Sequence, residues 1–243
     1  MDGARLGPYQ LIDELGCGGM GKVFKAEATC DVAGLETGCV VALKVIHPHL
    51  LETPGFFKRF LREAEIGQTI EHENVVRTYD CDALVVDGVQ QNFLVMEYVK
   101  GQTLRDLLLE LERVPEELCR HVGQEIARGL SAIHEAGVLH RDLKPENVLI
   151  TAEHRIKVMD LGVARLKDEA VRLSRADAFV GSLEYAAPEQ FRAREGEPDG
   201  RADLHALGML LYELSTGQHP YRDEDPARAV SYTHLTLPTT SGV

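Results

Sequence analysis

Residues 140–147 are His140-Arg141-Asp142-Leu143-Lys144-Pro145-Glu146-Asn147, a polar octet between two apolar segments. Residues 129–134 carry apolar side chains at helical spacing, and residues 148–150 are typical of a short buried strand. The octet is therefore expected to be a loop that joins a helix to a strand, a common place for chemistry. Its aspartate, lysine and asparagine would bring a base, a cation and a neutral oxygen ligand into one small volume.

The octet resembles the catalytic loop of the protein kinases, which has His-Arg-Asp followed after a gap by Asn. The resemblance implies that Asp142 accepts or orients the proton of a substrate hydroxyl. It also implies that Lys144, typical of Ser/Thr kinases, neutralises charge on the transferred phosphoryl group, and that Asn147 is a ligand of Mg²⁺, with Mn²⁺ as a substitute. An ordinary polar turn between a helix and a strand is the alternative interpretation.

A glycine-rich stretch lies near the N-terminus, after a strand expected over residues 9–15. Its glycines at positions 16, 18 and 21 have the G-x-G-x-x-G spacing, which lets backbone N–H groups approach phosphate oxygens. A flexible hairpin also collects glycines, and a dinucleotide-binding turn has the same spacing. Residues 22–26 alternate like a strand, whereas the dinucleotide fold needs a helix there. The kinase resemblance implies an ATP-binding hairpin with Val23 above the adenine.

One lysine, Lys44, lies inside the apolar strand expected over residues 40–46. A buried ammonium group is costly unless a carboxylate pairs with it. A lysine on the solvent face of an edge strand is the alternative. The sequence Val-Ala-Leu-Lys matches a kinase motif, which implies that Lys44 binds the α- and β-phosphates and pairs with a glutamate on the next helix.

That helix is expected over residues 56–67, where two phenylalanines, Glu63 and Gly67 fall on one face. We choose Glu63 as the partner of Lys44, because an unpaired acid on the inward face would be unusual. Glu65, on another face, is the less favoured alternative. Gly67 stands where kinases carry a larger apolar residue, so we expect looser packing of this helix against the other lobe.

Two more strands are expected over residues 75–79 and 93–98, and helical periodicity begins at Thr103, a plausible N-cap. The linker over residues 99–102 is therefore the expected boundary between two lobes. The resemblance implies that the backbone of Glu97 and Val99 meets the adenine edge. The implied ATP-binding residues are Leu15, Gly16, Gly18, Gly21, Val23, Ala42, Lys44, Met96, Glu97, Val99 and Leu149.

Asp160 ends a strand expected over residues 156–159 and is followed by Leu161-Gly162. An aspartate before a glycine is often only a turn residue. Its position after Asn147 resembles the D-F-G motif of the kinases with Leu in place of Phe. The resemblance implies that Asp160 and Asn147 hold two Mg²⁺ ions.

The segment from Val163 to Ala187 is polar, which suits an activation segment, and residues 181–189 resemble the anchor that ends such a segment. The resemblance implies that Ser182 lies near the catalytic aspartate and that Glu189 pairs with an arginine in later helices. We predict autophosphorylation at Ser174, because a phosphate there could pair with Arg141 and order the segment.

Asp203 lies in an apolar helix expected over residues 202–214. The resemblance implies that its buried carboxylate fixes the backbone of the octet. A bland core or surface helix is the alternative.

Composition sets limits on the class of protein. The 243 residues are 44% hydrophobic with a net charge of -13 and no dense run of Lys or Arg, so a nucleic-acid partner is not expected. Five cysteines without a C-x-x-C pair fit free thiols in a reducing cytoplasm. No signal region and no run of about 18 apolar residues is present, so we expect no membrane segment in this chain and a cytoplasmic location. A membrane anchor beyond residue 230 stays open.

The predicted fold is α+β, the two-lobed protein-kinase fold. An N-terminal lobe over residues 1–98 would have a five-stranded antiparallel sheet and one helix. A mainly helical, incomplete C-terminal lobe would cover residues 99–230. Residues 231–243 are rich in Thr and carry no charge except His, and we expect them to be a non-native tail.

The predicted function is that of a bacterial eukaryotic-like (Hanks-type) Ser/Thr protein kinase, favoured by the sequences at 18–21 and 188–190. It would transfer the γ-phosphate of ATP to Ser/Thr hydroxyls of proteins, including itself, with a kinase dimer serving phosphorylation in trans. A catalytically silent nucleotide-binding scaffold is the alternative. A small-molecule phosphotransferase is disfavoured by the full activation segment.

Overall fold

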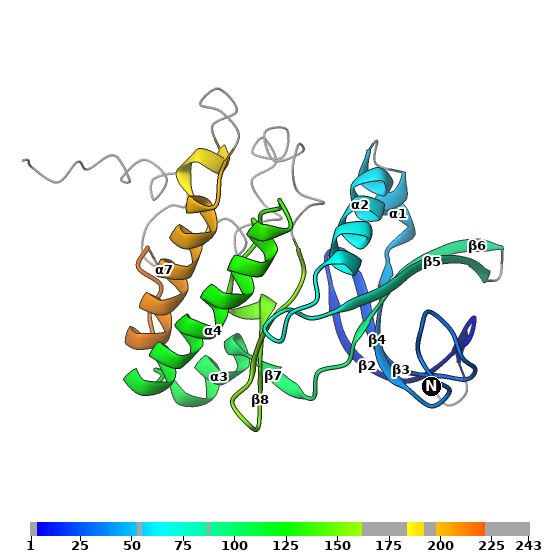
Figure 1. Cartoon of the computed structure of the whole chain (residues 1–243), viewed down its shortest axis with the longest axis horizontal. Helices are drawn as coiled ribbons and strands as arrows, with labels where there is room; N and C mark the ends of the chain where they lie inside the picture. The colour runs from blue at the N-terminus through cyan, green and yellow to red at the C-terminus, as the bar shows by residue number, and fades with distance from the viewer. Residues whose placement is uncertain (1–3, 53–54, 87, 162–183, 192–197, 222–243) are drawn as a thin grey trace, which may run out of the picture.

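The computed structural model describes residues 4–52, 55–86, 88–161, 184–191 and 198–221, without the side chains of residues 59 and 63. Within these ranges the chain forms two lobes (Figure 1). A curved antiparallel sheet with a long helix against it makes the first lobe. Helices with a small sheet beside them make the second. This two-lobed α+β architecture is the predicted one.

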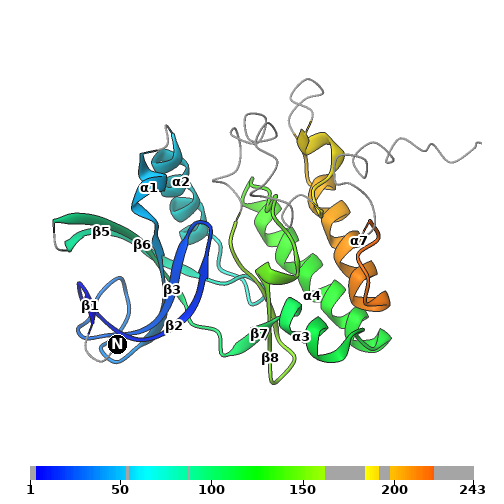
Figure 2. The same cartoon turned by 180° about the vertical axis from the view of Figure 1, so that it is seen from behind.

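The first sheet has six strands in the order β1-β2-β3-β4-β6-β5, all paired antiparallel (Figure 2). The strands are β1 Arg5–Leu6, β2 Tyr9–Gly18, β3 Gly21–Ala28, β4 Val40–Ile46, β5 Thr78–Val86 and β6 Val89–Glu97. The sequence predicts five strands, and the additional one is β1, which turns back onto β2 at Gly7 (φ 56°). Two residues are too few to give an alternating pattern, so β1 leaves no signal in the sequence.

The strand expected over residues 75–79 is wrong in its start, because β5 begins at Thr78. Val76 instead donates its N–H to the carbonyl of Val158 in the second lobe at 2.8 Å. Asn74 explains this, since its buried side chain donates to the carbonyl of Ile156 at 2.9 Å and to Glu125 Oε2 at 2.8 Å. The chain before β5 therefore belongs to the second lobe.

Helix α2 (Phe56–Thr69) packs its apolar face against the sheet. Residues four apart lie on the same face of a helix, which brings two phenylalanines and an alanine to the sheet. One apolar cluster joins helix and sheet, and its buried members are Ile46, Phe56, Phe60, Ala64 and Leu94. The one-turn helix α1 (Pro48–Leu51), which the sequence does not predict, precedes α2.

The linker between the lobes contains a short strand that the sequence does not predict. This strand, β7 (Gly101–Thr103), pairs with β8 (Val148–Thr151). Helix α3 (Leu104–Leu111) follows at once, and Thr103 is its N-cap as expected. The N–H of Asp106 donates to Thr103 Oγ1 and the N–H of Thr103 donates to the Asp106 carboxylate, both at 3.1 Å. This reciprocal pair is a capping box, which fixes where α3 begins.

The second lobe is built on α4 (Glu116–Glu135) and α7 (Arg201–Thr216), which pack side by side in both views (Figures 1 and 2). The small sheet has the order β7-β8-β9, with β9 at Ile156–Val158. The described part of the second lobe also contains the 3-10 turns η1 (Pro145–Asn147) and η3 (Pro188–Phe191). The octet lies between the end of α4 and β8, as predicted.

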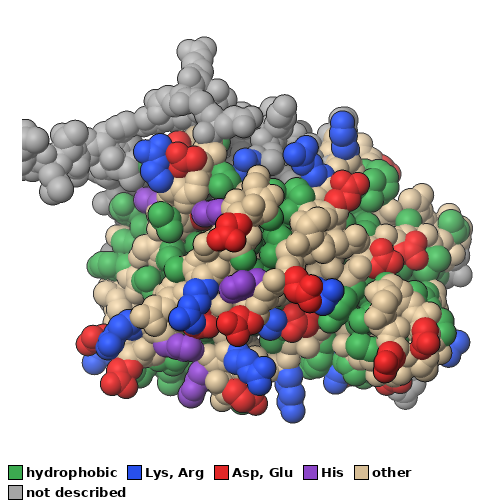
Figure 3. Space-filling model, in the orientation of Figure 1, with side chains coloured by type: hydrophobic (Ala, Val, Ile, Leu, Met, Phe, Trp, Pro, Cys, Tyr) green, Lys and Arg blue, Asp and Glu red, His purple; other side chains and the backbone are tan. Residues whose placement is uncertain are grey.

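Charged side chains of both signs lie on the face of the molecule seen in the view of Figure 1. Figure 3 shows acidic and basic groups interspersed on one face of the molecule. Among the described helices, none combines the length and the apolar character needed to cross a membrane.

Candidate active site

The backbone of the octet is held by Asp203, a fully buried carboxylate on α7. Its Oδ2 accepts the N–H of His140 at 2.8 Å, and its Oδ1 accepts the N–H of Arg141 at 2.7 Å. Nε2 of His134, on α4, lies 2.7 Å from the same carboxylate. These contacts satisfy a carboxylate that would otherwise be costly to bury. The loop is thus tied to α7 at the two residues before Asp142.

The ring of His140 is buried and bridges two parts of the site. Its Nε2 lies 3.0 Å from the carbonyl of Met159, and its Nδ1 lies 3.3 Å from the N–H of Asp142. A carbonyl can only accept and an amide N–H can only donate, so we assign a neutral ring with its proton on Nε2. Arg141 has φ 65°, a left-handed conformation uncommon for residues with side chains. Gln190 donates to the Arg141 carbonyl at 3.1 Å.

Asp142, Lys144 and Asn147 meet in one small volume. Nδ2 of Asn147 donates to Oδ2 of Asp142 at 2.9 Å and to the Asp142 carbonyl at 2.7 Å. Nζ of Lys144 lies 3.4 Å from Oδ2 of Asp142. The side chains of Asp142 and Lys144 are only 10% and 15% exposed, so their charges are weakly screened by solvent.

Lys44 reaches from β4 to the second lobe and pairs with Asp160, with 2.7 Å between Nζ and Oδ1. Lys44 is buried, and the Asp160 side chain is 32% exposed. Burial alone would raise the pKa of Asp160, but the charge and hydrogen bond of Lys44 outweigh it and hold that pKa below its ordinary value. Asp160 is therefore ionised at neutral pH. Its φ of 60° is a second left-handed conformation in the site.

Asn147 and Asp160 lie close together, because the N–H of Met159 donates to the Asn147 carbonyl at 2.9 Å. The Asn147 amide nitrogen donates twice to Asp142, which leaves its side-chain oxygen to accept a cation. Oδ2 of Asp160 has no hydrogen bond to the described residues. Oxygen donors of this kind suit Mg²⁺ or Mn²⁺. The two residues implied as metal ligands thus fit such an ion chemically.

The glycine-rich turn joins β2 to β3, with Gly18 opposite Gly21. A Cβ at Gly21 would lie 2.0 Å from the carbonyl oxygen of Val45, so only glycine fits there. A Cβ at Gly16 or Gly18 would meet nothing within 4 Å. His47, after β4, places Nε2 3.1 Å from the Gly18 carbonyl. The turn is close-packed at one end and open where a phosphate would approach.

Strand register brings the other implied ATP-binding residues of the first lobe together. Val23 lies opposite Lys44 on β3 and β4, and Ala42 lies opposite Met96 on β4 and β6. Leu15, on β2 before the turn, is 48% exposed. The sheet therefore presents one apolar wall beside the lysine.

The hinge side of the site is fixed by Glu97. Its N–H donates to the carbonyl of Arg77 at 2.9 Å, and its carboxylate pairs with Lys157 at 2.8 Å. With that N–H engaged, an adenine could meet Glu97 only at its carbonyl, which leaves Val99 as the candidate donor. Leu149, on β8 opposite Lys157, comes from the second lobe.

A cavity of about 20 Å³ lies behind the site, lined in part by Gly67, Thr78, Met96, Asp160 and Leu161. By this measure it could hold about one water molecule. It lies between α2 and the second lobe, where looser packing was expected from the absence of a side chain at Gly67. Against β5 the packing is tight, because a Cβ at Gly67 would lie 2.6 Å from Thr78 Oγ1.

Comparison with known proteins gives the family. The protein kinase domain model matches residues 9–238. The chain belongs to the protein kinase domain family. Among its relatives are a probable serine/threonine-protein kinase, SCO3848, of Streptomyces coelicolor and the serine/threonine-protein kinase PknB of Mycobacterium leprae. They are 37% and 34% identical over 94% and 93% of this chain.

A crystal structure of the PknI kinase domain of Mycobacterium tuberculosis, a single-site mutant of that protein, has the same fold. Its TM-score is 0.70 at 27% sequence identity, covering 93% of this chain and 81% of that one. The chain spans about a third of the length of the first curated relatives, 33% and 35%. The family and the bacterial serine/threonine class are thus the predicted ones.

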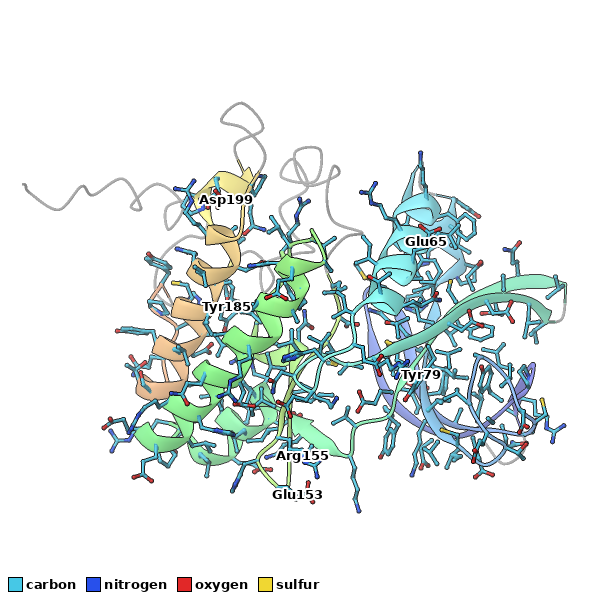
Figure 4. All side chains as sticks on the ribbon, viewed as in Figure 1. Glu65, Tyr79, Glu153, Arg155, Tyr185 and Asp199 are labelled. Carbon is cyan, nitrogen blue, oxygen red and sulfur yellow. The ribbon has the colours of Figure 1, made fainter. Side chains whose placement is uncertain are left out.

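Several predicted residues of the kinase domain lie outside the described part of the chain. They are Ser174, Ser182, the side chain of Glu63 and the tail over residues 231–243. The pairing of Lys44 with Glu63 therefore stays a prediction, while Glu65 is exposed on α2 (Figure 4). Glu189 is half-buried in η3, where its negative charge acts on Arg201 and His205 of α7.

Sequence reasoning gave no structural role to several residues that hold the kinase site. Gln190 and Asn74 act through hydrogen bonds to backbone groups, which leave no pattern in a single sequence. Glu213 did leave a signal, because it is a lone acid within the apolar run of α7 and is buried. A buried acid requires a partner, which is Arg105 of α3 at 2.7 Å.

Proposed function

We propose that this kinase domain transfers the γ-phosphate of ATP to serine or threonine hydroxyls of proteins, including its own chain. The observation that carries the proposal is the 2.7 Å ion pair between Lys44 and Asp160 across the lobes, above the cluster of Asp142, Lys144 and Asn147. Two lobes thus meet at the groups that phosphoryl transfer needs. Relatives named as serine/threonine-protein kinases support the same class of reaction.

Asp142 would orient the attacking hydroxyl and accept its proton. Its carboxylate is positioned by Asn147 on one side and by Lys144 on the other. The His140 ring and the Asp203 carboxylate hold the backbone at and before Asp142, so the base has little freedom to move. Such a fixed base contributes through orientation more than through basicity.

Positive charge would offset the charge of the phosphates. Lys144 stands beside the base, and Lys44 is placed by β4 below the glycine-rich turn. Asn147 and Asp160 would hold Mg²⁺, which would supply positive charge to offset the negative charge of the phosphates. The open backbone at Gly16 and Gly18 would contact the phosphates from above.

The experiment measures transfer from radiolabelled Mg·ATP to the chain itself and to a library of serine- and threonine-centred peptides. The wild-type chain is expected to label both. Asp142→Asn, which keeps the shape of the base, should lower the rate by about 10²–10⁴-fold. The exposed Asp199→Asn, near the start of α7, is the matched control and should keep the wild-type rate. A wild-type chain without transfer, or an Asp142→Asn variant as active as the wild type, would overturn the proposal.

A further inference from the structure

Arg105, which lies outside the kinase motifs, is the centre of a polar cluster. Its Nε donates to Glu146 Oε1 at 2.8 Å, its Nη1 to Glu213 Oε1 at 2.7 Å and its Nη2 to the Tyr185 hydroxyl at 2.8 Å. The Tyr185 hydroxyl in turn donates to Glu213 Oε2. One guanidinium therefore joins α3, the octet, the segment at 184–191 and α7.

Burial makes this cluster strongly interdependent. The Glu213 side chain is 9% exposed, Tyr185 is buried, and the Arg105 side chain is 29% exposed. Burial opposes the charge of Arg105, but its bonds to Glu213 and Glu146 prevail and raise its pKa. Burial and the bond to Glu213 likewise raise the pKa of Tyr185. At neutral pH the guanidinium is charged and the phenol is neutral.

The four residues connect the octet to the segment 184–191. Glu146 directly precedes Asn147 in the octet, and Arg105 is the hydrogen-bond partner of its side chain among the described residues. Tyr185 is the second residue of the segment 184–191, whose Gln190 also donates to the octet backbone. A substrate hydroxyl has to reach Asp142, and Gln190 binds the backbone of the residue before it, so this segment borders the place that the substrate must enter. Figure 4 shows Tyr185 beside α7, away from the sheet lobe.

Resting on the kinase function proposed above, we propose that Arg105 is a positioning residue that fixes the segment 184–191 against the octet and so sets the affinity for the protein substrate. Among the described residues its hydrogen-bond partners are Glu146, Glu213 and Tyr185, none of which is among the implied ATP-binding residues. Substrate affinity should therefore depend on Arg105 while ATP affinity does not.

The test compares Arg105→Met with Arg120→Met, an arginine whose side chain is 62% exposed on α4. With a serine-centred peptide selected by the wild-type chain, Arg105→Met should raise KM for the peptide about tenfold or more, because small displacements of a bound substrate are costly. KM for ATP should stay within about twofold of wild type. Arg120→Met should leave both values unchanged. Arg105→Lys keeps the charge but cannot donate to all three partners in the geometry of the guanidinium, so it should raise KM for the peptide by less than Arg105→Met does.

A second variant separates positioning from folding. Arg105→Met leaves the buried Glu213 carboxylate without its cation, which destabilises the fold. Adding Glu213→Gln removes that charge and should restore the thermal midpoint while KM for the peptide stays high, since Glu146 and Tyr185 still lack the guanidinium that joins them.

The outcomes distinguish this inference from the function on which it rests. A normal KM for the peptide in Arg105→Met, or a KM that returns together with stability in the double variant, would overturn the role of Arg105 alone. An inactive wild-type chain would overturn the kinase function, and the role of Arg105 with it.

Discussion

Four of the five cysteine thiols fall into two groups that should differ in reactivity. Cys17 and Cys30 are exposed, whereas burial and two nearby aspartates raise the pKa of Cys81 to about 11, and burial raises the pKa of Cys119. Thiolates are the reactive species. In alkylation at pH 8 followed by mass spectrometry, Cys17 and Cys30 should react about 100-fold faster than Cys81 and Cys119. Equal rates in the folded chain would contradict this, and a denatured sample provides the reference.

His205 gives the stability of the domain a dependence on pH. Burial lowers its pKa below 6.5, although the charge of Glu189 opposes that effect. The unfolded chain then binds the proton more readily, so stability is complete above pH 6.5 and falls as the pH drops through the lowered folded value. Between pH 7.5 and 5.5 the thermal midpoint of the wild type should fall more than that of His205→Gln, by about 2 °C.

The control for His205 is the exposed His49 of α1. His49→Gln should reproduce the pH dependence of the wild type. If His205→Gln and the wild type lost stability in parallel, the titration of His205 would not be the cause.

The absence of a side chain at Gly67 lets helix α2 pack closely against β5. A Cβ at Gly67 would lie 2.6 Å from Thr78 Oγ1 on β5, whereas one at Gly208 of α7 would meet nothing within 4 Å. In denaturant unfolding, Gly67→Ala should lose about 1–3 kcal/mol from overpacking. Gly208→Ala should gain up to about 1 kcal/mol from helix propensity. Adding Thr78→Ala to Gly67→Ala should recover part of the loss, and a Gly67→Ala chain as stable as Gly208→Ala would refute the close contact.

Elements that depend on neighbouring residues could be predicted from the sequence. The octet, the start of α3 at Thr103 and the buried face of α2 follow from patterns within a few residues, and the structure has them there. The start of β5 cannot be predicted from such a pattern. Val75 and Val76 have side chains typical of a strand, but their backbones pair with Val158 in the second lobe.

Contacts between distant elements were the part of the candidate site that no local pattern revealed. Arg105 joins Glu146 to Glu213, and it precedes them in the sequence by 41 and 108 residues. Nothing in the spacing of Arg105 indicates this. The acid in the apolar run of α7 indicated only that a partner exists.

At the scale of the whole molecule, the two lobes are joined by a few specific contacts. Lys44 pairs with Asp160 at the site, and Lys157 pairs with Glu97 at the hinge, at 2.7 and 2.8 Å. The third connection is the segment before β5, held by the buried side chain of Asn74. Because Val76 donates a backbone bond to Val158 beside it, this segment fixes how α2 and β5 stand above the octet.

Replacing Asn74 should therefore weaken the contact between the two lobes and also lower the free energy of unfolding. Asn74→Ala removes two buried hydrogen bonds and should cost about 2–3 kcal/mol in denaturant unfolding. Hydrogen exchange at the amides of Val76 and Val158 should speed up with it. Asn92→Ala is the matched control, because Asn92 is equally buried but its Nδ2 has no partner among the described residues, and it should cost under about 1 kcal/mol. Equal losses in the two variants, or unchanged exchange at Val158, would show that the lobes are joined without Asn74.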